Sequence, residues 1–247
     1  MSLRLLTYNI RKGGRGREQD LAAVINAVQP DLVVLQEASR PQVVAALGEA
    51  TGLPYWGSRR RESLGYLSRD PLDHVEWHHP RLSRHAFLEL APAGQNVRVF
   101  GVHLSAVHAA WTERRRALEL RALLASVARH QDGFHILTGD FNTLAPGELL
   151  DLRKLPFRLK PFVWLSGGQV RWRTIQLVLD AGYVDGYRRH HPGYAGHTFP
   201  TWDPHVRLDY VFLPAAHADR LRDCRIVKDP PAPEASDHFP LLADIEI

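Results

Sequence analysis

The first forty residues alternate between short apolar runs and one segment with helical periodicity. Residues 3–10 are apolar and β-prone, and the glycine- and arginine-rich stretch at 11–17 predicts a basic loop after that strand. Residues 20–30 then carry apolar side chains at helical spacing, at Leu21, Val24, Ile25 and Val28. The apolar run DLVVLQE at 31–37 follows, so the pattern predicts a strand, a helix and a second strand.

Beyond residue 40 the pattern predicts three more helices among closely spaced strands. The helices are expected at 42–50, 111–129 and 174–180, and the middle one has a clear apolar stripe. The strands are expected at 65–68, 75–77, 86–91, 97–104, 134–137, 208–213, 222–227 and 241–247, with antiparallel pairing in the 65–104 region. Helices interspersed with mostly adjacent strands predict two packed sheets covered outside by helices.

Composition places the chain among ordinary globular proteins. Its 247 residues are 45% hydrophobic, and no low-complexity stretch divides them, which predicts a single domain over 1–247. One cysteine, Cys224, excludes an intrachain disulfide and a multi-cysteine zinc site. Neither a signal peptide nor a membrane-spanning run is evident, so a cytoplasmic protein is expected.

The net charge is +4, and the basic side chains are nearly all arginine. The planar guanidinium matches phosphate oxygens, so a phosphate partner is compatible with the composition. A general bias toward arginine would give the same numbers, and composition does not choose between the two.

Polar side chains recur inside or just after the apolar strand segments. Burial of an ionisable group is costly unless it is paired or bound to a cation. One such residue could be a satisfied core residue, but a set spread over six segments indicates a shared site; its members are Asn9, Glu37, His103, Asp140, Asn142, Asp209, Asp237 and His238.

An ordered set of short motifs covers nearly the whole chain. They are TYNI at 7–10, LQE at 35–37, GYLSRDP at 65–71, GVHL at 101–104, TGDFN at 138–142, RLDYVF at 207–212 and SDHFP at 236–240. In this order they resemble the endonuclease/exonuclease/phosphatase (DNase I-like) superfamily. The resemblance implies a four-layer α/β/β/α sandwich, two mixed sheets flanked by helices, with the site at one rim.

The resemblance also implies a divalent-metal-dependent phosphoester hydrolase. Mg²⁺ suits such chemistry because it prefers oxygen ligands and needs few protein carboxylates, and Mn²⁺ could substitute. By analogy with LQE, Glu37 is the first choice of ligand, with Asn9 and Asp237 completing the shell. A cap or salt bridge at a strand end is the competing interpretation of Glu37 alone.

Asp140 and Asn142 stand two residues apart after a buried strand. If the extended geometry continues, their side chains point the same way, and one could orient the water while the other binds a phosphate oxygen. An Asx-type turn that ends the strand is the alternative.

The histidines are assigned by resemblance. Asp209 and His238 match the family's carboxylate–imidazole pair, in which the carboxylate fixes the tautomer and favours the charged ring. His103 resembles the second histidine, a phosphate contact or a leaving-group acid, although a lone strand histidine is more often simply packed. It stands where apurinic endonucleases carry a tyrosine-bearing segment, which argues against specificity for abasic sites.

Substrate contacts are expected from basic and aromatic residues in loops. The segment 153–173 mixes arginine and lysine with aromatic residues, a combination that can hold a backbone phosphate and stack a base, and 197–207 is the second such segment. The candidates are Arg11, Arg114, Trp172, Arg173 and Trp202. The leading prediction is a nuclease or phosphodiesterase acting on nucleic acid, most simply DNA. The alternatives are a phosphatase or phospholipase-like enzyme on inositol phosphates or lipid head groups, and an inactive binding protein.

Overall fold

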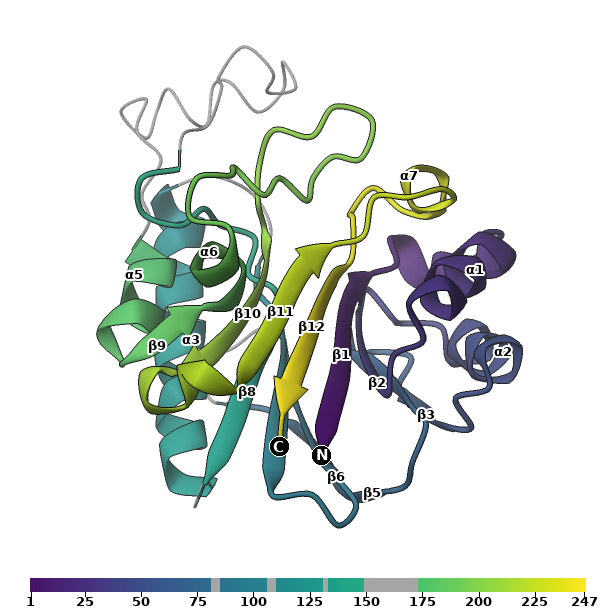
Figure 1. The fold of residues 1–247 in the computed structure, drawn as a ribbon, viewed down its shortest axis with the longest axis horizontal. Helices are drawn as coiled ribbons and strands as arrows, with labels where there is room; N and C mark the ends of the chain where they lie inside the picture. The colour runs from purple at the N-terminus through teal and green to yellow at the C-terminus, as the bar shows by residue number, and fades with distance from the viewer. Residues whose placement is uncertain (81–84, 106–109, 131–132, 149–172) are drawn as a thin grey trace.

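The computed structural model describes residues 1–80, 85–105, 110–130, 133–148 and 173–247, which form two packed β-sheets with helices outside them (Figure 1). The first sheet has the strand order β11 (Leu221–Ile226), β12 (Leu241–Glu246), β1 (Ser2–Asn9), β2 (Leu32–Gln36), β4 (Gly65–Ser68) and β3 (Tyr55–Ser58). The second has the order β5 (Leu72–His78), β6 (Phe87–Pro92), β7 (Val97–His103), β8 (Phe134–Asp140), β10 (Asp209–Pro214) and β9 (Tyr183–Asp185).

Strand direction brings polar chain segments to one rim. β1 and β2 are parallel and so are β7 and β8, whereas β12 and β10 run antiparallel to their neighbours. The ends of β1, β2, β7 and β8 therefore meet the beginnings of β10 and β12. A side-chain hydrogen bond from Asn9 to Asp140 joins the two sheets at this rim.

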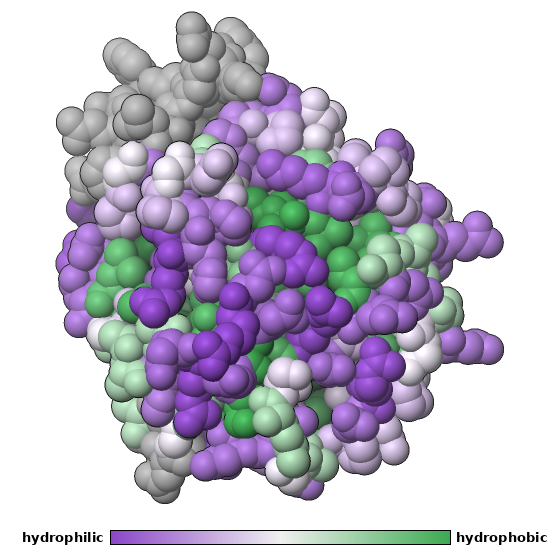
Figure 2. All heavy atoms as spheres, in the orientation of Figure 1, coloured by the Kyte–Doolittle hydropathy of each residue, from purple (hydrophilic) through white to green (hydrophobic). Residues whose placement is uncertain are grey.

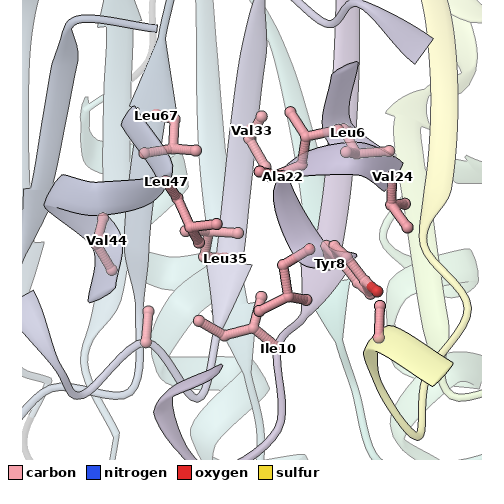
Figure 3. Close-up of a cluster of buried hydrophobic side chains, with 14 of the residues drawn as sticks. Leu6, Tyr8, Ile10, Ala22, Val24, Val33, Leu35, Val44, Leu47 and Leu67 are labelled. Carbon is pink, nitrogen blue, oxygen red and sulfur yellow. The ribbon is translucent and has the colours of Figure 1, made fainter. Parts of the chain in front are cut away.

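Alternation of apolar side chains builds the layers. Because successive strand residues point to opposite faces, Leu5 packs between the sheets while Leu6 packs under the helices. Figure 3 shows this outer cluster, where Leu6, Tyr8, Val33 and Leu35 meet the helical residues Ala22, Val24, Val44 and Leu47. The strands thus bury both faces, which explains their nearly continuous apolar runs.

Helices cover each outer face. α1 (Glu18–Val28), α2 (Pro41–Thr51) and the short α7 (Ala232–Ala235) lie on the side of the first sheet, and α3 (Ala110–His130) and α5 (Arg173–Asp180) lie over the second (Figure 1). The predicted four-layer α/β/β/α sandwich is confirmed.

Gly139 makes possible the close approach of β7 and β8 just before Asp140. Its φ is +141°, and a Cβ placed there would lie 2.0 Å from the carbonyl oxygen of Val102. Any larger residue would push the two strands apart, because that oxygen belongs to backbone and cannot move aside. The glycine of the TGD motif therefore fixes where the Asp140 carboxylate emerges.

Two strands and two short helices were not predicted. β3 and β9 have four and three residues, and α6 (Gly186–His190) and α7 have five and four, which is too short for a helical or strand period to show in the sequence. The antiparallel pairing expected across 65–104 holds for β5 to β7, but β4 joins the first sheet instead, between β2 and β3.

The surface over β11 and β12 is largely hydrophilic (Figure 2). Charged pairs lie along this edge of the first sheet, Arg4 with Asp244, Arg222 with Glu246 and Arg225 with Asp223. Charges on an edge strand oppose unwanted pairing with another chain. Among the described helices, none combines the length and apolar character needed to span a bilayer.

Candidate active site

Asn9 connects two carboxylates across the gap between the sheets. Its Nδ2 donates to Asp140 Oδ2 at 3.0 Å and lies 3.4 Å from Glu37 Oε1, while its Oδ1 accepts from the backbone N–H of Arg11 at 3.0 Å. Asn9 ends β1, Glu37 follows β2 and Asp140 ends β8. Three strands therefore contribute one continuous polar cluster.

Glu37 is held in a left-handed backbone conformation, with φ of +57°. Its Oε2 accepts from the backbone N–H of Lys12, so the carboxylate also anchors the basic loop that follows β1. A non-glycine residue adopts this conformation only when its surroundings enforce it. The half-buried carboxylate is fixed at the rim rather than extended into solvent.

Asp140 and Asp209 face each other in the β8–β10 ladder, and His238 lies between them. His238 Nδ1 is 2.9 Å from Asp209 Oδ2, and its Nε2 is 3.9 Å from Asp140 Oδ2. His103 Nε2 approaches the same Asp140 oxygen at 3.8 Å. Two imidazoles and an amide thus converge on one carboxylate oxygen.

Asn142 does not continue the strand. Its φ is +52°, its backbone N–H donates to Asp140 Oδ1 at 2.8 Å, and its Nδ2 donates to the carbonyl of Leu104 at 3.0 Å. The extended geometry considered for this pair is wrong, and the Asx-type turn describes it instead. The turn orients the Asp140 carboxylate so that its other oxygen faces Asn9.

Burial sets the protonation of the site. Desolvation raises the pKa of Asp140, and the charge of Asp209 adds to this while His238 opposes it. For His238, desolvation acts against the charged ring, but the Asp209 carboxylate outweighs it and raises the pKa. Desolvation, together with His85 and His238, lowers the pKa of His103 to about 3. At neutral pH the site holds a charged His238 beside a neutral His103.

Ser63 and His85, which no motif marks in the sequence, both contact His103. Ser63 Oγ hydrogen-bonds to Nδ1 of His103, and the His85 ring stacks on it with centroids 5.4 Å apart. Neither residue sits in a strand motif, so no periodicity marked them. When Ser63 donates, the remaining proton of the neutral ring is on Nε2, which faces Asp140.

The basic loop after β1 reaches the loop before β12. Arg11 Nε lies 3.2 Å from Asp237 Oδ2, and its guanidinium lies 6.0 Å from the ring of Trp202. Arg17, which was not predicted, donates to the carbonyls of Ile10, Arg11 and Ala235 and so ties this loop to α7. Charge alone could not distinguish this bridging arginine from its neighbours.

The remaining predicted substrate residues lie elsewhere or outside the described residues. Arg114 and Arg173 are exposed on α3 and at the start of α5, and within the described part of the chain no hydrogen bond or ion pair joins either to the rim cluster. Trp172 and most of the 153–173 segment lie outside the described residues.

Phe199 packs on His238 with ring centroids 4.7 Å apart and so belongs to the site.

The model of the Endonuclease/Exonuclease/phosphatase family matches residues 6–238. The chain belongs to this family. Its members are phosphoester hydrolases, so the class predicted from the motifs is confirmed.

Solved structures of this fold cover the chain end to end. A 3′ phosphatase from Neisseria, solved with a product DNA hairpin, is 22% identical with a TM-score of 0.74, over 99% of this chain and 100% of that one. An AP endonuclease from Archaeoglobus fulgidus is 20% identical with a TM-score of 0.75 and the same coverage. A humanized TDP2 from D. rerio is 17% identical with a TM-score of 0.70, over 100% of this chain and 99% of that one. No curated protein sequence matches the chain.

The donor set fits the divalent cation that this family typically uses. Glu37 and Asp140 bring carboxylate oxygens to the rim, where Asn9 Nδ2 lies 3.4 Å from the first and 3.0 Å from the second, and Asp237 adds another beside Arg11. Asp140, Asp209 and His238 also have ligand atoms within 4.8 Å of one another, but a charged His238 ring has no nitrogen lone pair for a cation, so the carboxylates are the candidate ligands. Asp209 Oδ1 is buried without a hydrogen-bond partner among the described residues. An orphaned carboxylate oxygen is costly unless a cation or a water satisfies it. The rim could therefore hold a metal ion.

Proposed function

We propose that this chain is a magnesium-dependent phosphodiesterase that hydrolyses nucleic acid, with DNA as the expected substrate. The observation that supports it most directly is the convergence of Glu37, Asp140 and the Asp209–His238 pair at one rim, from strands of both sheets. A phosphodiester resists attack because its oxygens repel the nucleophile and the leaving alkoxide is poor. The site must neutralise charge, position a water and assist departure.

Glu37 and Asp237 are the residues that would hold the cation, and Asn9 orders the Glu37 carboxylate relative to Asp140. Oxygen donors of this kind suit Mg²⁺, and Mn²⁺ is the expected substitute. The bound cation would neutralise phosphate charge and orient the scissile group. Asn9 currently donates to both Glu37 and Asp140, so direct ligation through its Oδ1 would require that atom to leave the N–H of Arg11.

Asp140 would accept the proton of the attacking water. Its pKa is raised toward the range in which a carboxylate acts as a general base, and Oδ2 faces the cluster. As the water oxygen bonds to phosphorus, its proton passes to Asp140, and the bond from phosphorus to the leaving oxygen breaks, with the leaving alkoxide taking a proton from solvent water. The turn at Asn142 holds Asp140 in place through Oδ1.

The two histidines would take different roles because their charges differ. His238, charged through Asp209, would donate from Nε2 to a phosphoryl oxygen, where negative charge increases. His103 is neutral and would act as a hydrogen-bond donor to phosphate from Nε2, not as a leaving-group acid. Phosphate contact is thus favoured over proton donation for His103.

Arg11 and Trp202 are suited to contact the nucleic acid beyond the scissile phosphate. Trp202 is 68% exposed, and the Arg11 guanidinium lies beside it and beside Asp237. A cation next to an exposed indole can hold a backbone phosphate while the ring stacks on a base.

A substrate panel tests the proposal. Single-stranded DNA, abasic duplex, 5′-phosphotyrosyl DNA and inositol phosphates would be assayed with Mg²⁺ and with a chelator, using wild type, Asp140→Asn and the matched control Asp219→Asn. Asp219 is an exposed carboxylate in the 3-10 helix η3 (Ala215–Arg220). We expect Mg²⁺-dependent cleavage of DNA by wild type and by the control only. Activity confined to inositol phosphates would show that these, and not nucleic acid, are the substrate. Full activity of Asp140→Asn would show that Asp140 is not the general base.

A further inference from the structure

The outer face of strand β5 carries a cluster of ionisable side chains. Val75 and Trp77 pack between the two sheets, so the alternate residues His74, Glu76 and His78 point away from that core. β5 is an edge strand whose neighbour is β6. The three side chains therefore line one stripe of the outer face.

The strand register sets Glu76 directly opposite Glu89 of β6. Two carboxylates in this position repel each other, which weakens strand pairing unless positive charge lies between them. Here the imidazoles surround them: His78 Nε2 is 2.6 Å and His74 Nε2 is 3.8 Å from Glu89 Oε2. His74 Nε2 is also 3.4 Å from Glu76 Oε2, and His78 Nδ1 is 3.5 Å from Glu76 Oε1.

Glu89 is the buried member of the cluster, with a side chain only 2% exposed. Its two oxygens have different partners, because Arg98 pairs with Oε1 while the histidines face Oε2. Oε2 of Glu89 is thus directed at two imidazole nitrogens.

We propose that His74, Glu76, His78 and Glu89 form a second metal site, selective for a divalent transition metal of the Zn²⁺ class. One donor atom from each residue lies within 4.8 Å of the others, so a small cation could contact all four. Imidazole nitrogen with carboxylate oxygen is a donor set that Zn²⁺ favours, whereas Mg²⁺ takes oxygen donors. The site shares no residue with the catalytic rim.

Four protein donors leave no open position on a tetrahedral ion, which is typical of a structural site. Three donors come from β5 and the fourth from β6, so the ion would fasten the edge strand to the sheet. It would also remove the repulsion between Glu76 and Glu89. Occupancy should therefore raise the stability of the protein independently of hydrolysis.

Calorimetric titration of metal-stripped protein with Zn²⁺ in excess Mg²⁺ tests this site. The variant His74→Gln/Glu76→Gln changes two well-exposed ligands, with side chains 40% and 52% exposed, so the fold should persist. His79→Gln, a 60% exposed histidine beside the cluster, is the matched control. Asp140→Asn removes a donor from the rim. The melting temperature with and without Zn²⁺ gives a second readout.

We expect one tight Zn²⁺ per chain in wild type, His79→Gln and Asp140→Asn, with a higher melting temperature when Zn²⁺ is bound. The double variant should bind at least about tenfold more weakly and lose the thermal shift. Unchanged affinity in the double variant, or loss of the tight Zn²⁺ in Asp140→Asn, would overturn the proposal. The absence of tight Zn²⁺ binding in wild type would also overturn it, leaving an ion-pair network only.

Discussion

His238 is held by Asp209 on one side and faces Asp140 on the other. Its Nδ1 lies 2.9 Å from Asp209 Oδ2, and its Nε2 lies 3.9 Å from Asp140 Oδ2. All three groups are buried, so their charges interact with little screening by water. The protonation of the ring therefore links catalysis and stability at this rim.

Asp209→Asn should lower the pKa of His238 and so reduce both turnover and stability. Asn keeps the shape of the side chain but removes the charge that raises the His238 pKa, so the ring would be neutral at pH 7. We expect turnover to fall by about 10²-fold or more. The unfolding free energy at pH 6 should fall by on the order of 3 kcal/mol, as for a broken buried pair. An NMR titration of the His238 ring and urea unfolding measure the two effects.

The pH dependence of the unfolding free energy provides the control for the Asp209→Asn prediction. The folded-state pKa of His238 is raised above its ordinary value of 6.5. The contribution of His238 to the unfolding free energy is therefore fully present below pH 6.5 and is lost as pH rises through the raised pKa. Wild type and Asp219→Asn should show this decline, and Asp209→Asn should not. The same decline in Asp209→Asn would show that another group causes it.

Asp140→Asn should abolish turnover yet stabilise the metal-free protein. The raised pKa means that the folded state holds the Asp140 proton more tightly than the unfolded state, so stability falls as pH rises from about 3.8 through the raised value. Asn removes that penalty but replaces one of the two oxygens that accept hydrogen bonds from Asn9 and Asn142, so we expect a net gain on the order of 1 kcal/mol at pH 8. Urea unfolding in a chelator measures it, and a loss of stability there would contradict the proposed cost of burying this charge.

The fold was predictable because its strands bury both faces. The apolar runs at 31–37 and 97–104 and the stripe of the helix at 111–129 locate β2, β7 and α3. Short elements such as β3 were missed, since its aromatic residues are half exposed and its four positions show no period. The layer order came from the family resemblance, because periodicity reports which faces are buried and not which sheet a strand joins.

The rim residues were predictable for a different reason. Asp140 and Asp209 are charged residues in apolar strands, a combination that is costly unless the charge is paired or bound to a cation. Residues that support them from loops carried no such signal: Ser63 and His85 contact His103, and Arg17 ties together the loops. The turn at Asn142 depends on a left-handed backbone that sequence period does not report.

Glu37→Gln should lower the affinity for Mg²⁺ more than it lowers the stability of the fold. Gln can still accept from the N–H of Lys12, so the loop should remain anchored. Loss of the carboxylate charge should raise the Mg²⁺ concentration for half-maximal activity at least about tenfold. Glu49→Gln, an exposed carboxylate on α2, is the control. If both variants need the same Mg²⁺ concentration for half-maximal activity, Glu37 is not a metal ligand.

Trp202→Ala should weaken nucleic-acid binding without affecting the chemical step. The ring is 68% exposed and lies beside Arg11, so its removal should cost little stability. The loss of one stacked base corresponds to about 1–3 kcal/mol, or roughly fivefold or more in affinity. Tyr194→Ala is the matched control, because Tyr194 is 69% exposed in the same connection between α6 and β10.

Fluorescence anisotropy with a labelled single-stranded oligonucleotide, in the Asp140→Asn background, separates binding from cleavage. We expect weaker binding for Trp202→Ala alone. If both variants bind as tightly as their parent, Trp202 does not contact the nucleic acid, and if both are weakened equally, the whole connection rather than this indole contributes to binding.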